Sequence, residues 1–242
     1  MRPQGIAMLL ALVLPLASPA PVLGAAAVQP LPVSARLATL SDAELAARLD
    51  FLQARLAAQR PTGLAWQWGW VGLSLTGTAH HAAEAAQADS KDARVRRLVE
   101  AVRSAGKAVF LLVEPLPARL GAEPMLAVPA EDRAGRLQRL AAGESQLLVS
   151  GQHAETRYSL WRHLRSIAVS LLGSGLIVTF GDRSDAFHTL LTNIALDEAQ
   201  IWSEPWQPAT DLRDYRTQFA APVGASWEVQ ATGTGLALVL RF

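Results

Sequence analysis

The chain has 242 residues, of which 50% are apolar and 18% are charged, and its formal net charge is +1. A near-neutral chain offers no electrostatic basis for binding nucleic acid, so no nucleic-acid partner is expected. The absence of cysteine excludes disulfides, thiolate nucleophiles and cysteine-based metal sites. The length suits one domain with a tail and is ample for a sizeable core.

The first 27 residues have the organisation of a secretory leader. Arg2 supplies a positive charge, residues 6–16 form an apolar run, and residues 24–27 offer small side chains for cleavage. An uncleaved anchor is disfavoured because prolines interrupt the run and it is shorter than the ~20 residues of a membrane span. The sequence therefore predicts a signal peptide over 1–27, a linker over 28–40 and export to the bacterial cell envelope.

Between residues 41 and 206 the sequence has helical periodicity and capping residues. Ser41 and Glu44 form a capping box ahead of a leucine stripe, and Pro61 to Gly63 are expected to end this first helix. The remaining predicted helices cover 64–79, 91–113, 130–151, 167–180 and 185–202. A polar connector at 80–89 and a proline-rich loop at 115–130 separate some of them. We predict a mostly α fold, a helical bundle of about four to six helices over 41–206.

Residues 207–242 are predicted to be a tail with a short C-terminal β-hairpin. Residues 226–231 and 235–242 are rich in strand-forming residues or alternate between apolar and other side chains, and a Thr-Gly-Thr turn joins them. The strand that ends in Phe242 also resembles the last strand of outer-membrane barrels. A barrel needs at least eight strands, however, and the helical middle of the chain does not supply them. We expect the hairpin to cover one end of the helices instead.

Two uncharged runs, 64–79 and 167–180, are candidates for membrane helices. They are short for full spans, but tryptophans gather at their ends as in a membrane-interface aromatic belt, namely Trp66, Trp68, Trp70 and Trp161. The basic residues near 91–97 suit a cytoplasmic loop between two spans. We therefore expect hydrophobic helices in or at the membrane, with the inner membrane favoured. The alternative is a soluble periplasmic helical domain that binds a small ligand or a metal ion.

Two predicted helices carry lines of polar side chains at helical spacing. One line is Glu100, Arg103 and Lys107, and the other is Asn193, Asp197 and Gln200. Three interpretations remain open: a buried polar pocket or ion path, a paired network that fixes helix register, and solvated faces of amphipathic helices. The first two require the helices at 91–113 and 185–202 to face each other.

The Trp-Gln-Trp-Gly-Trp start at residues 66–70 and the Ile-Trp-Ser-Glu-Pro end at 201–205 carry one resemblance. With these motifs, residues 45–206 are similar to uncharacterised multi-helix bacterial envelope proteins. The resemblance implies four membrane-associated helices and no particular activity. The charges at Arg103, Lys107 and Asp197 depart from a purely apolar membrane pattern.

No phosphate-binding loop, nucleophile elbow or zinc-protease motif occurs, so an enzyme is not expected and no cofactor is predicted. The best metal-ligating candidates are incomplete as a site and are His80, His81, Glu84, Asp185 and His188. Without a complete ligand set, no metal site is predicted. We expect a non-enzymatic structural or interaction role, with the membrane as a partner and with a protein partner or a second copy of the chain left open.

Overall fold

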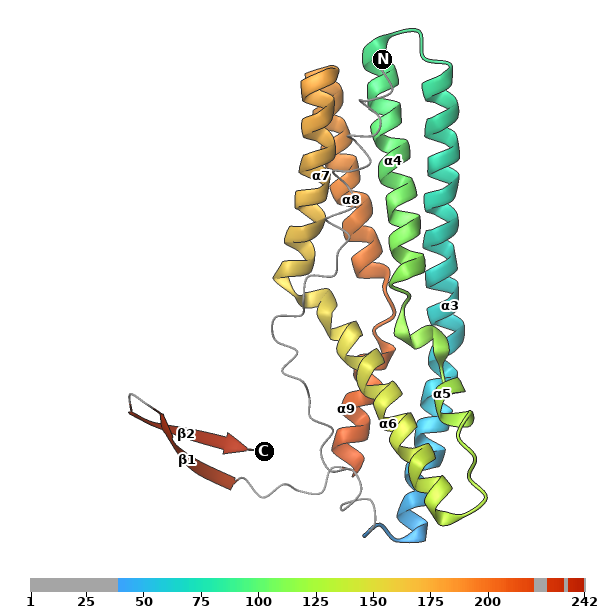
Figure 1. The fold of residues 1–242 in the computed structure, drawn as a ribbon, viewed down its shortest axis with the longest axis vertical. Helices are drawn as coiled ribbons and strands as arrows, with labels where there is room; N and C mark the ends of the chain where they lie inside the picture. The colour runs from blue at the N-terminus through green and yellow to red at the C-terminus, as the bar shows by residue number, and fades with distance from the viewer. Residues whose placement is uncertain (1–38, 220–225, 233–234, 242) are drawn as a thin grey trace.

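The structure is a computed structural model that describes residues 39–219 and, by backbone alone, two strands at 226–232 and 235–241 (Figure 1). The predicted leader and nearly all of the predicted linker lie outside the described residues. Within them the chain is mostly helical with about six long helices, so the predicted bundle of about four to six helices is confirmed. The helices are α3 (Asp42–Ala86), α4 (Lys91–Val113), η2 (Pro117–Leu120), α5 (Glu123–Leu126), α6 (Arg133–Glu155), η3 (Thr156–Tyr158), α7 (Leu160–Phe180), α8 (Arg183–Ser203) and α9 (Gln207–Phe219).

Side-chain oxygens cap the N-termini of four long helices. Ser41 accepts from the amide of Glu44, as the sequence predicts, and Ser90 accepts from that of Ala93. The Glu44 carboxylate does not complete the capping box, because it binds Arg48 instead. Asp132 caps α6, and Asp182 caps α8.

The largest departure from the sequence prediction is α3, a single helix of 45 residues. The expected break at Pro61 to Gly63 is wrong, and so is the polar connector from residue 80, since the helix continues to Ala86. A proline inside a helix costs about 3 kcal/mol, because it removes one backbone hydrogen bond and crowds the preceding turn. Contacts of α3 with neighbouring elements, made just before and just after Pro61 in the sequence, offset that cost.

Close packing of η2 against α3 occurs at Gly63. A Cβ atom at this position would lie 2.9 Å from the Arg119 backbone nitrogen and 3.0 Å from the Ala118 carbonyl carbon. Only a glycine admits this approach, so the residue expected to end the helix is instead its contact point with η2. Gly121, with φ of 54°, then turns the chain from η2 towards α5.

Figure 1 shows a rod with two halves that share α3. The lower half contains the N-terminal part of α3 with η2, α5, α6 and α9. Its core is apolar and is formed by leucines of α3 and α6 together with residues of the α5 region and α9: Leu45, Leu52, Leu56, Ala122, Met125, Leu140, Leu147, Leu212 and Tyr215. The segment assigned to the tail from residue 207 thus begins with a helix, α9, that completes this core.

The upper half contains the C-terminal part of α3 with α4, α7 and α8 (Figure 1). Helices α3 and α4 form one antiparallel pair, α7 and α8 form the other, and α4 packs against α7. The shared apolar core of this half is small: Val95, Val99, Ile177 and Ala186. Ser170 and Ser174 are buried between the helices, where their small side chains permit close approach.

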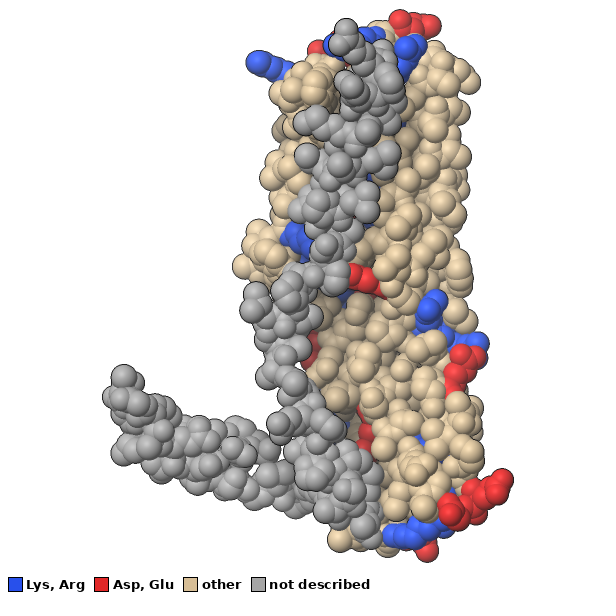
Figure 2. Space-filling view, viewed as in Figure 1, with Lys and Arg blue, Asp and Glu red and all other residues tan. Residues whose placement is uncertain are grey.

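The outer surface of the upper half is apolar. All but four of the exposed large apolar side chains in the described residues belong to its helices, the exceptions being Leu120, Leu126, Val149 and Tyr158. Figure 2 shows this surface as mostly tan, with blue and red atoms gathered towards the ends of the rod and at mid-height. Polar groups lie inside, which reverses the usual arrangement of a helical bundle in water.

In the tail, β1 (Ser226–Thr232) and β2 (Gly235–Arg241) pair antiparallel, with Ser226 opposite Arg241 and Thr232 opposite Gly235. The expectation that this segment covers one end of the helices stays a prediction.

Candidate functional site: a buried charge network and an aromatic girdle

The two predicted polar lines lie opposite each other between α4 and α8. Arg103 donates to Asp197 Oδ2 at 2.5 Å and to Asn193 Oδ1 at 2.8 Å. Lys107 Nζ lies 2.9 Å from Asp197 Oδ1. Asn193 in turn donates to Glu100 at 3.0 Å. The network therefore contains two cations and two carboxylates joined through one amide.

These charges are shielded from solvent. The side chains of Arg103, Asp197 and Lys107 retain 11%, 13% and 17% of their exposure. Ser170 of α7 donates a further hydrogen bond to Asp197 at 3.2 Å, so three helices meet at this carboxylate. A solvated helix face would not have this geometry.

Gln200 does not join the network through its side chain in the described contacts, and its backbone carbonyl accepts from Ser203. Two surface hollows lie elsewhere, beside residues 129–138 and 84–97. The network consists of packed side chains with matched charges, as expected of a pairing that fixes helix register.

Below the network, aromatic side chains gather on α3, η3, α7 and the end of α8, where the two halves meet. This girdle comprises Trp66, Trp68, Trp70, Tyr158, Trp161, Trp202 and Trp206. The predicted aromatic residues take two roles within it. Trp68 and Trp161 are exposed on the outside, at 53% and 65%. The indole nitrogens of Trp66 and Trp70 instead both donate to Ser203 Oγ of α8, at 3.2 and 3.1 Å.

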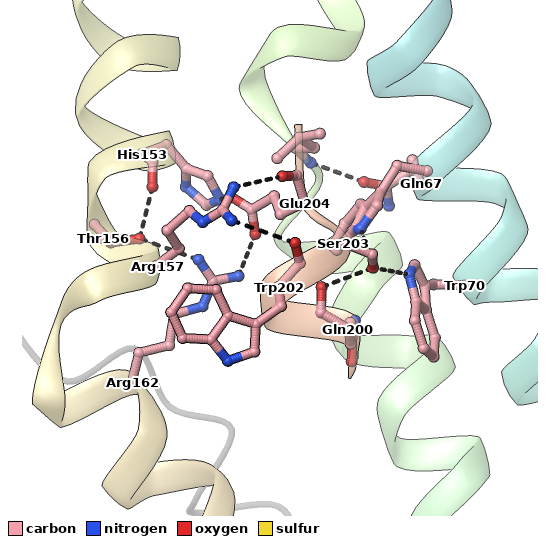
Figure 3. Close-up of polar contacts among 12 residues, drawn as sticks. Gln67, Trp70, His153, Thr156, Arg157, Arg162, Gln200, Trp202, Ser203 and Glu204 are labelled. Carbon is pink, nitrogen blue, oxygen red and sulfur yellow. Dashed lines mark hydrogen bonds and ion pairs between the residues drawn. The ribbon is translucent and has the colours of Figure 1, made fainter. Parts of the chain in front are cut away.

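Gln67, between these indoles, is buried and ties α3 to the end of α4. Its carbonyl accepts from the Leu116 amide at 2.8 Å, and its amide donates to the Leu111 carbonyl (Figure 3). The Leu111 carbonyl lies in the last turn of α4, where carbonyls lack partners within the helix, and the Leu116 amide follows the end of that helix. The polar residue in the Trp-Gln-Trp segment therefore anchors the end of a neighbouring helix.

A second buried charge cluster lies at the same level, where α6, η3, α7 and α8 meet (Figure 3). Its centre is Glu204, whose side chain is fully buried. Arg162 binds Glu204 Oε2, and His153 Nε2 lies 3.4 Å from Oε1. Arg157 donates to the Glu204 backbone carbonyl at 3.1 Å and lies 5.4 Å from the rings of Tyr158, Trp202 and Trp206.

Burial lowers the pKa of His153, the nearby Glu204 carboxylate opposes this shift, and the Arg162 cation adds to it. The neutral imidazole is therefore the favoured form, and Glu204 Oε1 has no hydrogen-bond partner among the described residues. Sequence reasoning missed this cluster. Arg162 and His153 lie 42 and 51 positions from Glu204 in the sequence, and only the turn between α6 and α7 brings them together.

The five candidate metal ligands separate into two groups. His80, His81 and Glu84 lie together near the C-terminal end of α3. Asp185 instead binds Arg96 at 2.8 Å, and His188 Nδ1 lies 2.9 Å from the Ser184 carbonyl.

Helix α7 is the one described helix whose length and composition suit a membrane span. In comparisons with known proteins, no family model, no curated protein and no solved structure matches the chain. The charge network, the girdle and the apolar outer surface are therefore the basis for assigning a function.

Proposed function

We propose that the protein is an exported envelope protein whose upper half is embedded in the membrane as a four-helix bundle and whose lower half is an aqueous interaction domain. Its role is structural or interactive and not catalytic. The observation that carries the proposal is the reversed polarity of the upper half, with apolar side chains outside and the Arg103–Asp197–Lys107 network inside.

The inward network explains how helices α4 and α8 can lie in a membrane although their composition alone does not suit a span. Each charge at mid-helix costs about 2.5–3.5 kcal/mol on insertion scales. That cost falls when charges face the bundle interior and pair with one another. Arg103, Lys107 and Asp197 meet both conditions.

The dimensions support a bilayer of less than average thickness. The uncharged stretches 64–79 of α3 and 167–180 of α7 have 16 and 14 residues, which corresponds to about 21–24 Å of helix. A typical hydrocarbon core is about 30 Å thick. The exposed Trp68 and Trp161 at the lower border suit the bilayer interface, and local thinning accommodates the difference.

The absence of cysteine allows a direct test by single-cysteine labelling of isolated membranes. Leu171→Cys and Leu191→Cys place thiols on the outer surface of the upper half, whereas Val149→Cys places one on the lower half, and all three native side chains are about half exposed. We expect a charged maleimide to label only Val149→Cys, and all three after denaturation. Rapid labelling of Leu171→Cys in native membranes would contradict the proposal.

Carbonate extraction tests the same proposal independently. The chain should remain in the membrane fraction, like an integral protein. Release into the soluble fraction would favour the alternative, a soluble periplasmic helical domain that binds a small ligand or a metal ion.

The orientation follows from the predicted leader. With a cleaved leader, the lower half would face the periplasm and the turn between α3 and α4 would face the cytoplasm, near the basic residues 91–97. In intact cells whose outer membrane is permeabilised, the maleimide should label Val149→Cys, and Asp89→Cys should react only after lysis. The reverse pattern would invert the topology without removing the membrane assignment. Cross-linking in whole cells would distinguish a protein partner of the lower half from a second copy of the chain.

A further inference from the structure

Three potential metal ligands converge near the C-terminal end of α3. His80 Nε2 lies 3.3 Å from Glu84 Oε2, and His81 Nδ1 lies 3.6 Å from the same oxygen. One ligand atom from each of the three residues lies within 4.8 Å of the others. His80 is exposed, while His81 and Glu84 are partly buried, so the cluster opens to solvent on one side.

These separations suit a small divalent ion. Zinc binds imidazole nitrogen and carboxylate oxygen at about 2.0–2.2 Å, so adjacent ligand atoms of a tetrahedral site lie about 3.3–3.5 Å apart. Two of the ligand pairs are already at or near this spacing. His81 Nδ1 is also shielded from solvent and has no hydrogen-bond partner among the described residues. Glu84 Oε2 is shielded as well, and its contacts are ion pairs.

Groups that favour a bound cation and groups that oppose it both lie near the cluster. The last turn of α3 contains no basic residue, and the carbonyl groups at a helix C-terminus carry partial negative charge. Arg97 of α4, however, places its guanidinium 2.8 Å from Glu84 Oε2. Because Arg97 is paired with the shared ligand oxygen, it must turn away or move to the other carboxylate oxygen when an ion binds.

We propose that His80 Nε2, His81 Nδ1 and the Glu84 carboxylate form a site for one divalent transition ion of the zinc class, with water at the remaining position. Imidazole nitrogens combined with one carboxylate favour zinc, nickel or copper over calcium and magnesium, which prefer oxygen ligands. The ion reaches the site from the side of His80, whose side chain is exposed. The site does not depend on the membrane assignment, since it uses only the α3–α4 end of the rod.

The test is a zinc titration of the full chain, purified in detergent with a tag that contains no histidine. Isothermal titration calorimetry should give one equivalent, and cobalt should add the visible absorption bands of a four- or five-coordinate ion. We expect His80→Asn, His81→Asn and Glu84→Gln each to weaken zinc binding by about tenfold or more. His188→Asn is the matched control and should bind as the parent does.

Arg97→Gln supplies a second and opposite test. Removing the competing guanidinium should tighten zinc binding several-fold, and helix content measured by circular dichroism checks that each variant is folded. Failure of the parent protein to bind one equivalent of zinc would overturn the proposal. Zinc binding by His81→Asn and Glu84→Gln as tight as that of the parent would also overturn it. Unchanged or weaker binding by Arg97→Gln would also overturn it, because Arg97 would then not compete for the Glu84 oxygen.

Discussion

Arg103 Nη2 lies 2.5 Å from Asp197 Oδ2, and this ion pair joins α4 to α8 inside the half of the molecule whose outer surface is apolar. Lys107 binds the other oxygen of the same carboxylate at 2.9 Å. Asp197 therefore pairs with two cations, and the pair of helices depends on this one acidic residue more than on either basic residue.

Asp197→Asn should be the most damaging single change in this network. It leaves Arg103 and Lys107 shielded without an anionic partner, and breaking a buried pair from one side costs about 3–5 kcal/mol. Lys107→Met should cost less, because Arg103 still pairs with Asp197. Thermal unfolding in detergent measures both, with the exposed Lys91→Met as control. Equal midpoints for Asp197→Asn and the parent would contradict the pairing.

A charge exchange tests whether Arg103 and Asp197 interact directly. It is best made in a Lys107→Met background, because Lys107 would otherwise repel an arginine at position 197. Arg103→Asp and Asp197→Arg should each destabilise, and the combined variant should recover part of the loss, with a coupling of about 0.5–3 kcal/mol. Additive losses would show that the two side chains do not pair.

Gly63→Ala should destabilise the protein although alanine is the better helix former. The added Cβ would lie 2.9 Å from the Arg119 backbone nitrogen, and such overpacking costs about 1–3 kcal/mol. Gly69→Ala, on the same helix with no atom near its Cβ position, is the matched control and should be neutral or stabilising by up to about 1 kcal/mol. Similar melting temperatures for the two variants would refute close packing by η2.

Stability should fall as the pH drops below 6.5, in part through His153. The pKa of this residue is lowered in the folded protein, so folding favours the neutral imidazole. The stability that the neutral His153 contributes is fully present above 6.5, the pKa of histidine in the unfolded chain. It is lost as the pH falls through the lower pKa of His153 in the folded protein. Thermal midpoints between pH 8 and 5 should therefore decline less for His153→Gln than for the parent. His188→Gln serves as the control. If the thermal midpoints of His153→Gln and the parent declined equally with pH, His153 would not be the source of the pH dependence.

Gln59→Leu should destabilise the lower half in a pH-dependent way. Gln59 donates to the buried Asp211 carboxylate at 2.8 Å. Burial raises the Asp211 pKa, while the Gln59 hydrogen bond and Arg55 lower it, so the ionised form depends on these partners. A carboxyl group whose pKa is raised by folding stabilises the folded protein at low pH. That stabilisation is lost as the pH rises through the pKa of the group in the folded protein.

Without Gln59, the loss of stability should be about 1–3 kcal/mol at neutral pH and smaller in acid, where Asp211 is protonated. Urea unfolding at the two pH values measures it. The exposed Gln53→Leu on the same helix is the control. A loss independent of pH would mean that Gln59 acts through packing and not through Asp211.

The elements that the sequence predicts well are those whose signals are local. Ser41 and Ser90 cap their helices through amides three residues away, and α4 begins and ends where predicted. The spacing of Arg103 and Lys107 on one helix, and of Asn193 and Asp197 on another, likewise depends only on helical period. That the two lines meet is a tertiary fact, because either line in water would also satisfy the pattern.

The features that sequence reasoning missed depend on distant contacts. Pro61 signals a helix end locally, and only the packing of η2 and the anchoring by Gln59 and Gln67 keep α3 continuous through it. Glu204 gave no signal beyond its place before a proline. Its partners Arg162 and His153 come from other helices, and no spacing rule connects residues so far apart.

The continuity of α3 through Pro61 has a mechanical consequence. Its 45 residues correspond to a rod of about 68 Å that belongs to both halves of the molecule. A tilt of about 10° around its middle would move each end by about 6 Å on this length. Any change in bilayer thickness or lateral pressure that reorients the upper end of α3 would thus be transmitted as a displacement of the lower half, about 30 Å away along the same rod.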